Sequence, residues 1–386
     1  MSSYLFFLGR VNNLCFAEAS RVIGTLYPEA NFVRILPHVA LVDELSEEQA
    51  VSLQERLGGT IKIAKVVETT SPLSTEQIEE KSAEVLVNLR KPEVKSLSFG
   101  IGEFGRESLD APNLTRIKKI LKSKGISSRF IDSPRYGLSA SVLLHQDVEE
   151  VVIVKANDQL VFGYTIAVQN IDDWTKRDRM KPRSDRRRGM LPPKLARILV
   201  NLAAPTKGER VLDPFCGTGT TLLEGLMVGQ EVIGADIRQE AVDQSRENIE
   251  WFVSQYPGNY TWDVAMSDAT KLTPELLRGT VDAIVAEGFL GPLTPLEREL
   301  PNMFKGLEKL YLGAFKQWTH ILKPGAVVCI ALPRVEAGKK VYSLSPLIDS
   351  LEKFGYNILL SPFVYDREGT ITQREIFTVQ FKGLDN

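Results

Sequence analysis

The stretch that most constrains the fold is LDPFCGTGTT at residues 212–221. The strand-like run GERVL leads into it and the helix-like run LLEGLMVG leaves it. A strand that enters a glycine turn and continues as a helix is the repeating unit of α/β proteins. Strand-like and helix-like runs alternate from about residue 190 onward, which predicts a doubly wound parallel sheet. Two strand-like runs at 356–365 and 374–381, with no helix between them, predict an added antiparallel hairpin.

The turn indicates the kind of ligand that this sheet binds. Such sheets bind ligands at the carboxyl ends of their strands, and Gly217 and Gly219 let a ligand approach the backbone. Leu222 replaces the third glycine of a dinucleotide-binding turn, and the Gly-Lys-Ser/Thr of a phosphate loop is absent. An acid at Asp213 is a poor neighbour for pyrophosphate and suits a cation. We therefore predict S-adenosylmethionine, which carries a sulfonium and an α-amino group.

Two further acids follow the next two predicted strands. Asp236 lies 19 residues after Gly217, where a carboxylate can accept hydrogen bonds from both ribose hydroxyls of the ligand. Asp268 follows the third strand and is placed to accept from an adenine amino group. The plainer alternative is a turn acid with two ordinary strand-end acids. Cys216 has no histidine near it in sequence, so we interpret it as a small turn residue and not as a nucleophile.

The rarer residue types point away from metals, secretion and membranes. The three histidines stand apart, and the three cysteines are odd in number and widely spaced. This pattern predicts neither a metal site nor a disulfide framework, and it favours a reducing cytoplasm. The start, MSSYLFFLGRVNN, is interpreted as a first strand and not as a signal peptide. No apolar run reaches the ~18 residues of a membrane span.

The length of 386 residues predicts more than one domain, since domains commonly have ~100–200 residues. Residues 1–66 follow the order strand, helix, strand, strand, helix, strand, which is typical of a ferredoxin-like unit. Residues 67–168 form a second α/β block, in which SASVLLHQ (139–146) is among the predicted strands. A basic linker follows at 169–188, and the Rossmann-like domain occupies 189–386. The predicted class is therefore α/β, with α+β blocks before the parallel sheet.

Positive charge is concentrated in the linker although the formal net charge is only −2. Residues 176–188 contain eight basic and two acidic residues. We predict that the eight basic side chains contact RNA phosphates, which positions the RNA without reading its bases. They are Lys176, Arg177, Arg179, Lys181, Arg183, Arg186, Arg187 and Arg188. The alternative is a solvated linker, as charge runs usually are. The basic helix at 116–125 is a second candidate.

The run DPFCGTGTTLLEG, preceded by RRGMLPPKLARILVNLA, resembles the THUMP-domain tRNA guanine-N2 methyltransferases that act at position ten. YLFFLGRVNNLCFAEASRVIG and RLGGTIKIAKVVE are similar to the ferredoxin-like domain before THUMP, and SASVLLHQ with EEVVIVK is similar to THUMP itself. The resemblance implies a cytoplasmic enzyme that binds tRNA, with a small activator subunit as a further partner. It also implies cofactor contacts from Pro192, Lys194, Asp213, Phe215, Gly217, Gly219, Asp236, Ile237 and Asp268.

Methylation of an exocyclic amine needs a second group of residues. The nitrogen lone pair is delocalised into the ring, so acceptors must bind the N–H groups and turn the lone pair toward the methyl, while stacking holds the base. The family uses a D/N-P-P-Y/F turn after the fourth strand. Here Glu287, Gly288 and Phe289 occupy that place, with the aromatic residue one position early. Either this turn still grips the amine, or the chain binds RNA and cofactor with weak or altered activity.

Three other functions remain open at this point. The same chemistry could methylate an amine of DNA, although the N-terminal half argues against it. The chain could also be an RNA-binding protein that keeps a cofactor site but has lost methyl transfer. A dehydrogenase is the weakest alternative, because the dinucleotide turn is incomplete.

Overall fold

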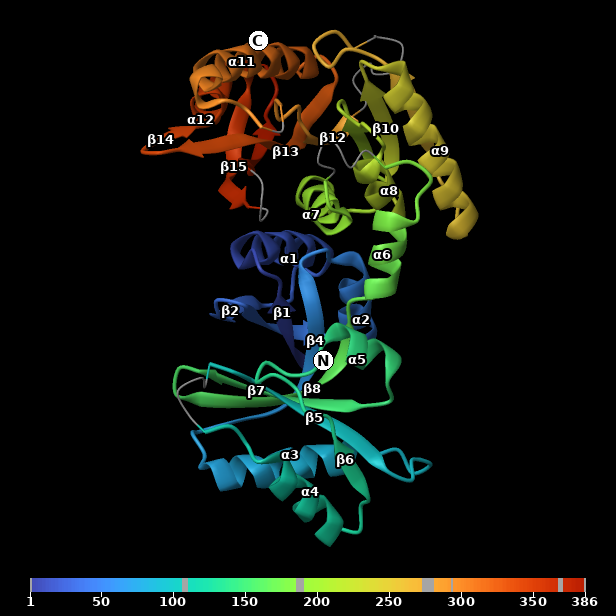
Figure 1. The fold of residues 1–386 in the computed structure, drawn as a ribbon, viewed down its shortest axis with the longest axis vertical. Helices are drawn as coiled ribbons and strands as arrows, with labels where there is room; N and C mark the ends of the chain where they lie inside the picture. The colour runs from blue at the N-terminus through green and yellow to red at the C-terminus, as the bar shows by residue number, and fades with distance from the viewer. Residues whose placement is uncertain are drawn as a thin grey trace. The chain divides into compact units, whose positions relative to one another are not determined.

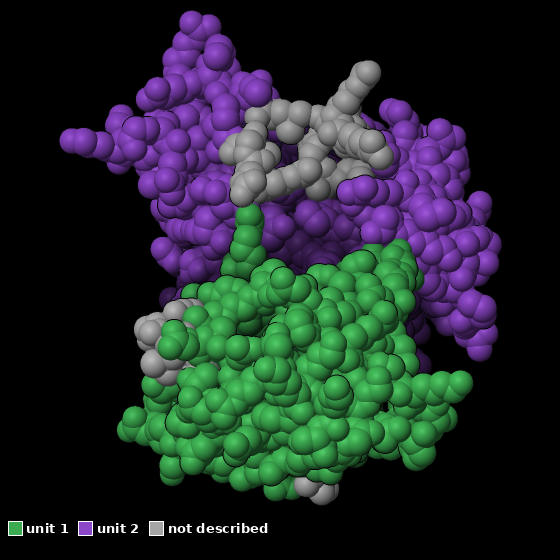
Figure 2. Space-filling view, turned by 60° about the horizontal axis from the view of Figure 1, so that its bottom comes forward, with its two compact units in different colours: residues 1–173 green, residues 174–386 purple. Residues whose placement is uncertain are grey.

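The computed structural model describes residues 2–105, 110–184, 191–272, 281–292, 294–366 and 371–384. The chain forms two compact units, residues 1–173 and residues 174–386, which are coloured separately in Figure 2. The boundary between them falls inside helix α6 (Ile171–Arg179). Within the described part of the chain, no helix combines the length and apolar character that a bilayer crossing needs.

The first four strands of unit 1 build a β-α-β-β-α-β unit. Strands β1 to β4 lie in the order β2-β3-β1-β4, with helix α1 after β1 and helix α2 after β3. This is the chain order of a ferredoxin-like unit. The bounds are β1 Ser2–Leu8, α1 Asn12–Leu26, β2 Phe32–Leu36, β3 Val39–Leu45, α2 Glu47–Arg56 and β4 Thr60–Thr70.

The other half of unit 1 extends the same sheet. Strand β4 pairs with β1 on one side and antiparallel with β8 on the other, so the sheet continues β8-β7-β5-β6. The predicted boundary between residues 66 and 67 falls within β4. Helices α3 and α4 pack on this half of the sheet (Figure 1). The bounds are α3 Thr75–Leu89, β5 Leu97–Phe104, α4 Leu114–Ser123, β6 Ser128–Phe130, α5 Ala140–His145, β7 Glu149–Ala156 and β8 Gln159–Val168.

Local capping explains where several of these helices begin. Ser46 and Ser74 each form a capping box, in which the serine oxygen accepts from the backbone N–H of the third helical residue. The prediction of a strand at 139–146 was wrong, because residues 140–145 form helix α5. The Ser139 hydroxyl accepts from Val142 N–H, and this cap starts a helix in a segment whose apolar run suggested a strand.

Unit 2 is a doubly wound sheet in the order β11-β10-β9-β12-β13-β16-β15, with β14 paired to β13. Strands β9 to β13 run parallel, and β16 is antiparallel to both β13 and β15. The predicted parallel sheet with its antiparallel terminal hairpin is therefore confirmed. The strands are β9 Arg210–Asp213, β10 Glu231–Asp236, β11 Trp262–Met266, β12 Val281–Glu287, β13 Leu322–Ala337, β14 Lys340–Tyr342, β15 Tyr356–Tyr365 and β16 Thr372–Phe381.

Helices cover both faces of this sheet (Figure 1). Successive residues of a strand point to opposite faces. Accordingly Val232 packs with α8 and α9, while Ile233 packs with α11 and α12. The turn after β9, which contains Gly217 and Gly219, and the turn at the end of β12, which contains Glu287, therefore lie at neighbouring strand ends of a well-packed sheet. They are called the glycine turn and the acid turn. The helices are α7 Pro193–Ala203, α8 Thr220–Met227, α9 Gln239–Gln255, α11 Leu300–Trp318 and α12 Ser345–Asp349.

Candidate active site

The first turn of the site connects β9 to α8 and is organised by Asp213. One carboxylate oxygen of Asp213 accepts from Phe215 N–H at 2.9 Å, and the other accepts from the Thr221 hydroxyl. The residue is 2% exposed. Burial is the largest cause that raises the pKa of Asp213, to about 7, while the two hydrogen bonds oppose the rise. Asp213 thus fixes the shape of the turn and holds a proton easily near neutral pH.

Two glycines give the turn a closed side and an open side. Gly219 has φ of +81°, and a side chain there would place Cβ 2.5 Å from the Ser245 hydroxyl oxygen on α9. Gly217 has φ of +53°, and its missing Cβ would meet only a carbonyl oxygen at 3.9 Å. A positive φ of this kind favours glycine. The turn is therefore pressed against α9 at Gly219 and open at Gly217, where a ligand can approach the backbone.

The second acid, Asp236, joins the ends of three strands. Its carboxylate accepts from Gly217 N–H at 3.2 Å and from Arg238 N–H at 3.0 Å. Its carbonyl accepts from Ser267 N–H at 3.0 Å, just after β11. A carboxylate has about four acceptor positions, so these bonds leave Asp236 able to accept from a ribose as well. Beside it, Ile237 is 67% exposed, which is unusual for an isoleucine and offers an apolar surface next to the acid.

The remaining residues predicted to bind the cofactor have other partners in the structure. Asp268 accepts from the N–H and the hydroxyl of Thr270, both at 2.8 Å, and so closes its own loop. The Phe215 ring packs against Tyr311 and Trp318. Pro192 is the N-cap of α7, and Lys194 Nζ lies 5.9 Å from the Trp174 ring. Among the predicted cofactor residues, Gly217 has open space at its backbone and Ile237 has an exposed side chain.

The second turn follows β12 and contains Glu287, Gly288 and Phe289. The guanidinium of Arg374, on β16, donates to Glu287. The Gly288 N–H donates to the Ala331 carbonyl at 3.0 Å, and a Cβ on Gly288 would overlap the Tyr311 hydroxyl. That hydroxyl donates to the Phe289 carbonyl at 2.8 Å. Phe289 is 58% exposed, so its ring is available to stack on a planar group.

The structure brings the two turns together. Strands β9 and β12 pair directly, so their carboxyl ends lie at the same edge of the sheet. The negative charge of Glu287 contributes, after burial and Asp236, to the raised pKa of Asp213. The buried Tyr311 also has a raised pKa, caused first by burial and then by Glu287. Asp213 and Glu287 therefore lie close enough to interact electrostatically, and the exposed Phe289 belongs to the same turn as Glu287. Among the described residues, no cluster of histidine, cysteine and carboxylate side chains could hold a metal ion.

Sequence reasoning missed Arg374, Tyr311 and Thr221. Thr221 follows the glycine turn closely, and its position at the start of a helix could have suggested a bond back to Asp213. Arg374 lies 87 residues from Glu287 in the chain, and Tyr311 lies 22 residues from Phe289. No local pattern connects these pairs, so only the fold reveals them.

The structure corrects the prediction for two of the basic residues. Arg177 and Lys181 are 2% and 4% exposed, so they are not phosphate contacts in this structure. Arg177 donates to Glu224 at 2.6 Å, and Lys181 donates to the Thr220 hydroxyl at 2.7 Å. Burial lowers the pKa of Lys181 to about 8. Both side chains instead fasten the end of α6 and the segment after it to α8.

The other basic residues of this segment differ among themselves. Lys176 is half-buried, with its ammonium 5.0 Å from the Tyr256 ring, and Arg179 is exposed. Arg183 is exposed and paired with Glu247 at 2.6 Å. Arg186, Arg187 and Arg188 lie outside the described residues. The prediction of an RNA contact therefore continues to apply to the exposed positions.

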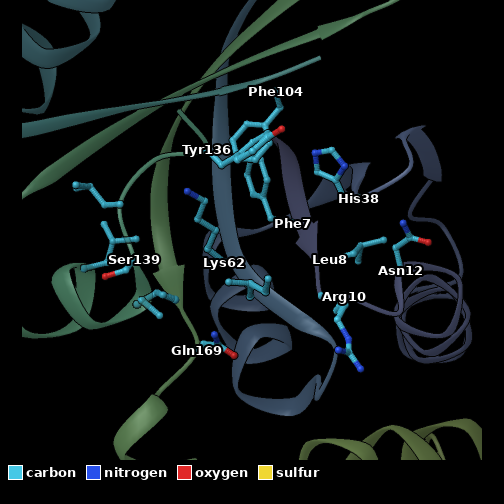
Figure 3. A pocket seen from close by; sticks show the side chains of 16 residues that line it. Phe7, Leu8, Arg10, Asn12, His38, Lys62, Phe104, Tyr136, Ser139 and Gln169 are labelled. Atoms are coloured by element: carbon cyan, nitrogen blue, oxygen red, sulfur yellow. The ribbon is translucent and has the colours of Figure 1, made fainter. Parts of the chain in front are cut away.

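Unit 1 contains a separate cavity of about 470 Å³ between its two halves (Figure 3). Its wall is mainly apolar and aromatic, with Arg10 and Lys62 as cations. The Lys62 ammonium lies 5.2 Å from the Phe7 ring centre and is paired with the buried Glu150 at 2.8 Å. Tyr136 is 52% exposed, and its ring centre lies 5.9 Å from that of Phe104. The cavity therefore offers aromatic faces next to positive charge.

The sheet order and the turns after β9, β10 and β12 define unit 2 as a Rossmann-like methyltransferase domain. The family model UPF0020, described as an RMKL-like methyltransferase domain, matches residues 181–345. A tRNA (guanine(10)-N2)-dimethyltransferase of Methanothermobacter thermautotrophicus is 37% identical over 145 residues, which cover 38% of this chain and 39% of that protein. A protein of Methanothermococcus thermolithotrophicus, described as a probable tRNA (guanine(10)-N2)-dimethyltransferase, is 33% identical over 116 residues, or 30% of this chain and 70% of that protein.

The chain belongs to the family of these tRNA (guanine(10)-N2)-dimethyltransferases. It spans well under half of the Methanothermobacter protein. Its fold is also similar to that of TrmN from Thermus thermophilus, with a TM-score of 0.57 and 19% identity over 98% of this chain and 99% of that one. At this identity the likeness is one of fold, and it extends over both units.

Proposed function

We propose that this protein is a tRNA methyltransferase that uses S-adenosylmethionine to methylate an exocyclic amine, most specifically guanine N2 at position ten. The observation that carries the proposal is that two turns, each containing an acid, follow neighbouring strands of one sheet. One turn is open at Gly217 beside Asp236 and Ile237, and the other presents Glu287 and the exposed Phe289. Family membership supports the same activity.

The residues of the first turn fit the cofactor. The space left by Gly217 admits a ligand to the backbone, and Asp236 can accept from ribose hydroxyls. Ile237 offers an apolar surface for the adenine, and Asp213 places a buried carboxyl below the turn, where it favours a cation. When bound, S-adenosylmethionine supplies an electrophilic methyl on a positively charged sulfur.

The residues of the second turn perform the substrate chemistry. Glu287 accepts a hydrogen bond from the amine and turns the nitrogen lone pair toward the methyl, while Phe289 stacks on the base. Bound S-adenosylmethionine would supply the methyl, with the carbon–sulfur electron pair left on sulfur. The Glu287 carboxylate would accept the amine proton and pass it to water. No metal is required for this transfer.

Methyl incorporation from labelled S-adenosylmethionine into bulk tRNA tests the proposal. We expect incorporation with the wild-type protein and a loss of about 100-fold in kcat for Glu287→Ala, since positioning of this kind contributes strongly to amine attack. Mass spectrometry of the digested tRNA identifies the nucleoside and separates one methyl from two. Incorporation into DNA but not tRNA would overturn the substrate, and cofactor binding without incorporation would overturn the enzyme.

We further propose that unit 1 binds the RNA. The aromatic cavity can stack an unpaired base beside Arg10, and helix α4 carries exposed lysines suited to phosphates. Tyr136→Ala should weaken tRNA binding about fivefold to 50-fold, as the loss of one stacking ring typically does. Tyr260→Ala in unit 2 is the control. Equal tRNA affinity in wild type and Tyr136→Ala would remove the cavity from the RNA site.

Two further expectations accompany this function. We propose that the protein acts in the cytoplasm, as its free cysteines and the resemblance to tRNA-modifying enzymes suggest. We also propose that a small activator subunit is an optional partner. Activity of the purified chain alone, compared with activity after addition of cell extract, shows whether such a partner is needed.

A further inference from the structure

The proposed methyl transfer assigns no role to the ion pair between Glu287 and Arg374. Arg374 comes from β16, which is antiparallel to both of its neighbours. Its side chain is 4% exposed, and that of Glu287 is 18% exposed. A guanidinium this well buried stays charged, because arginine does not lose its proton in proteins. The pair therefore places a permanent positive charge against the Glu287 carboxylate.

The protonation state of the Glu287 carboxyl depends on the charged and titratable groups around it. Asp213 lies at the end of β9 with Asp236 of β10 near it, Tyr311 approaches from α11, and Arg374 pairs with Glu287 from β16. Two close carboxylates resist full ionisation, and a cation beside one of them favours the ionised form of that one. Burial first, and then the charges of Asp236 and Glu287, raise the pKa of Asp213 to about 7.

We propose that Arg374 is a positioning residue that keeps Glu287 ionised and pointed at the substrate amine. The inference rests on the proposed amine methylation and assigns a role to the terminal hairpin of the sheet. A protonated Glu287 would gain an O–H donor and lose part of its acceptor capacity, so it would bind the amine N–H groups less well. An ionised Glu287 accepts from the amine and from Arg374 together, since a carboxylate has about four acceptor positions.

The backbone of this turn is held by bonds that do not involve Arg374. Tyr311 fixes the Phe289 carbonyl, and Ala331 fixes the Gly288 N–H. These bonds hold the backbone of the turn but do not set the charge of the Glu287 side chain. Substitution of Arg374 should therefore change the protonation and direction of Glu287 while the turn keeps its shape.

The test compares Arg374→Met and Arg374→Lys with the control Arg334→Met. Arg334 is a neighbouring arginine of the same sheet that bonds Gln373 and Glu336, not Glu287. With saturating S-adenosylmethionine and tRNA, we expect Arg374→Met to lower kcat at pH 7 by about 100-fold. The KM for tRNA and the Kd for cofactor should change less than threefold. Arg374→Lys should restore at least a tenth of the activity, and Arg334→Met should stay within threefold of wild type.

The pH profile separates a positioning role from a merely structural one. In Arg374→Met the pH of half-maximal kcat should move up by at least one unit, because the carboxylate has lost its cation. Equal loss at every pH, or an unchanged profile, would overturn the proposal. If Arg374→Met does not fold, the same shift in smaller size is expected for Arg374→Lys.

A measurement without turnover distinguishes this inference from the proposed function. Carboxyl ¹³C NMR follows the titration of Glu287, whose signal is assigned by its loss in Glu287→Gln. Glu287 should titrate at higher pH in Arg374→Met than in wild type. That shift together with absent methylation by the wild type would leave the ion-pair role standing and overturn the enzymatic function. Methylation with an unchanged Glu287 titration would do the reverse.

Discussion

Each of the two turns of the site holds a carboxyl group at a strand end, but the two groups are held in opposite ways. Asp213 is almost fully buried and is held by Phe215 and Thr221, close to it in the chain. Glu287 is partly exposed and is held by Arg374, which is distant in the chain. The difference follows from position. In the proposed function, the first turn shapes the backbone for the cofactor, while the second presents a charged side chain to the substrate.

The difference also separates the proton affinities of the two acids. Burial without a cation raises the pKa of Asp213 to about 7, whereas the guanidinium favours the ionised form of Glu287. Pairs of acids whose surroundings differ in this way commonly have different roles. Four substitutions or conditions sharpen this contrast, beginning with the one of largest expected effect.

Gly219→Ala should disrupt the first turn most strongly. The substitution places Cβ 2.5 Å from the Ser245 hydroxyl oxygen at a φ of +81°, so both the turn and α9 must shift. We expect the Kd for S-adenosylmethionine to rise more than 100-fold and the free energy of unfolding to fall by about 1–3 kcal/mol. Isothermal titration calorimetry and urea denaturation measure these changes.

The matched control for this variant is Gly306→Ala. Gly306 lies inside α11, where an added Cβ meets nothing within 4 Å. Alanine there should stabilise the protein by up to about 1 kcal/mol without changing cofactor affinity. A Gly219→Ala protein that binds cofactor as tightly as this control would show that the turn is not the cofactor site.

Gly288→Ala should disrupt the second turn and spare the first. The new Cβ would overlap the Tyr311 hydroxyl, so we expect kcat to fall by roughly 10-fold to 100-fold while the cofactor Kd stays within threefold. Tyr311→Phe removes the nearest obstructing atom at the loss of one hydrogen bond to Phe289, while two ring carbons still lie 2.8 and 2.9 Å from the added Cβ. The double variant should therefore regain only part of the activity that Gly288→Ala loses. If the two losses simply add, the Tyr311 hydroxyl does not explain the glycine.

The raised pKa of Asp213 predicts a pH dependence of cofactor binding. A cation near the turn binds best when Asp213 is ionised, so affinity should increase as pH rises through about 7. Between pH 6 and 7.5 the Kd should fall roughly eightfold, and Asp213→Asn should remove that dependence. In the ligand-free protein the sign is opposite for stability. The contribution of Asp213 is fully present below its unfolded pKa and is lost as pH rises through about 7.

The smallest expected effect is that of Ile237→Ser. The side chain is 67% exposed, so covering it with the cofactor should contribute only about 1 kcal/mol, and its loss should raise the Kd about fivefold. Val253→Ser on α9, 39% exposed, is the control and should leave the Kd unchanged. An unchanged Kd for Ile237→Ser would show that the apolar surface does not face the ligand.

The basic segment shows how far composition alone can be read. A run of eight basic residues predicted an RNA contact. One of them, Arg177, instead pairs with Glu224 inside unit 2, and Glu224 also pairs with Arg197 on α7. Glu224 is 47 residues from Arg177 in the chain. A buried carboxylate can hold an arginine away from solvent when the hydrogen bonds of the pair are complete. The helix α5 gives the same lesson on a smaller scale, since one serine cap decided between helix and strand.

The sequence by itself determined the fold class of unit 2, the position of the glycine turn and the identity of the acids near it. These residues are close in the chain or lie at successive strand ends, as Asp213 and Asp236 do, so spacing and residue type suffice to predict them. Tertiary structure alone decided which arginine pairs with Glu287, why position 288 is glycine and where the basic residues go. Those contacts join segments far apart in the chain, and only the packed sheet brings them within hydrogen-bonding distance.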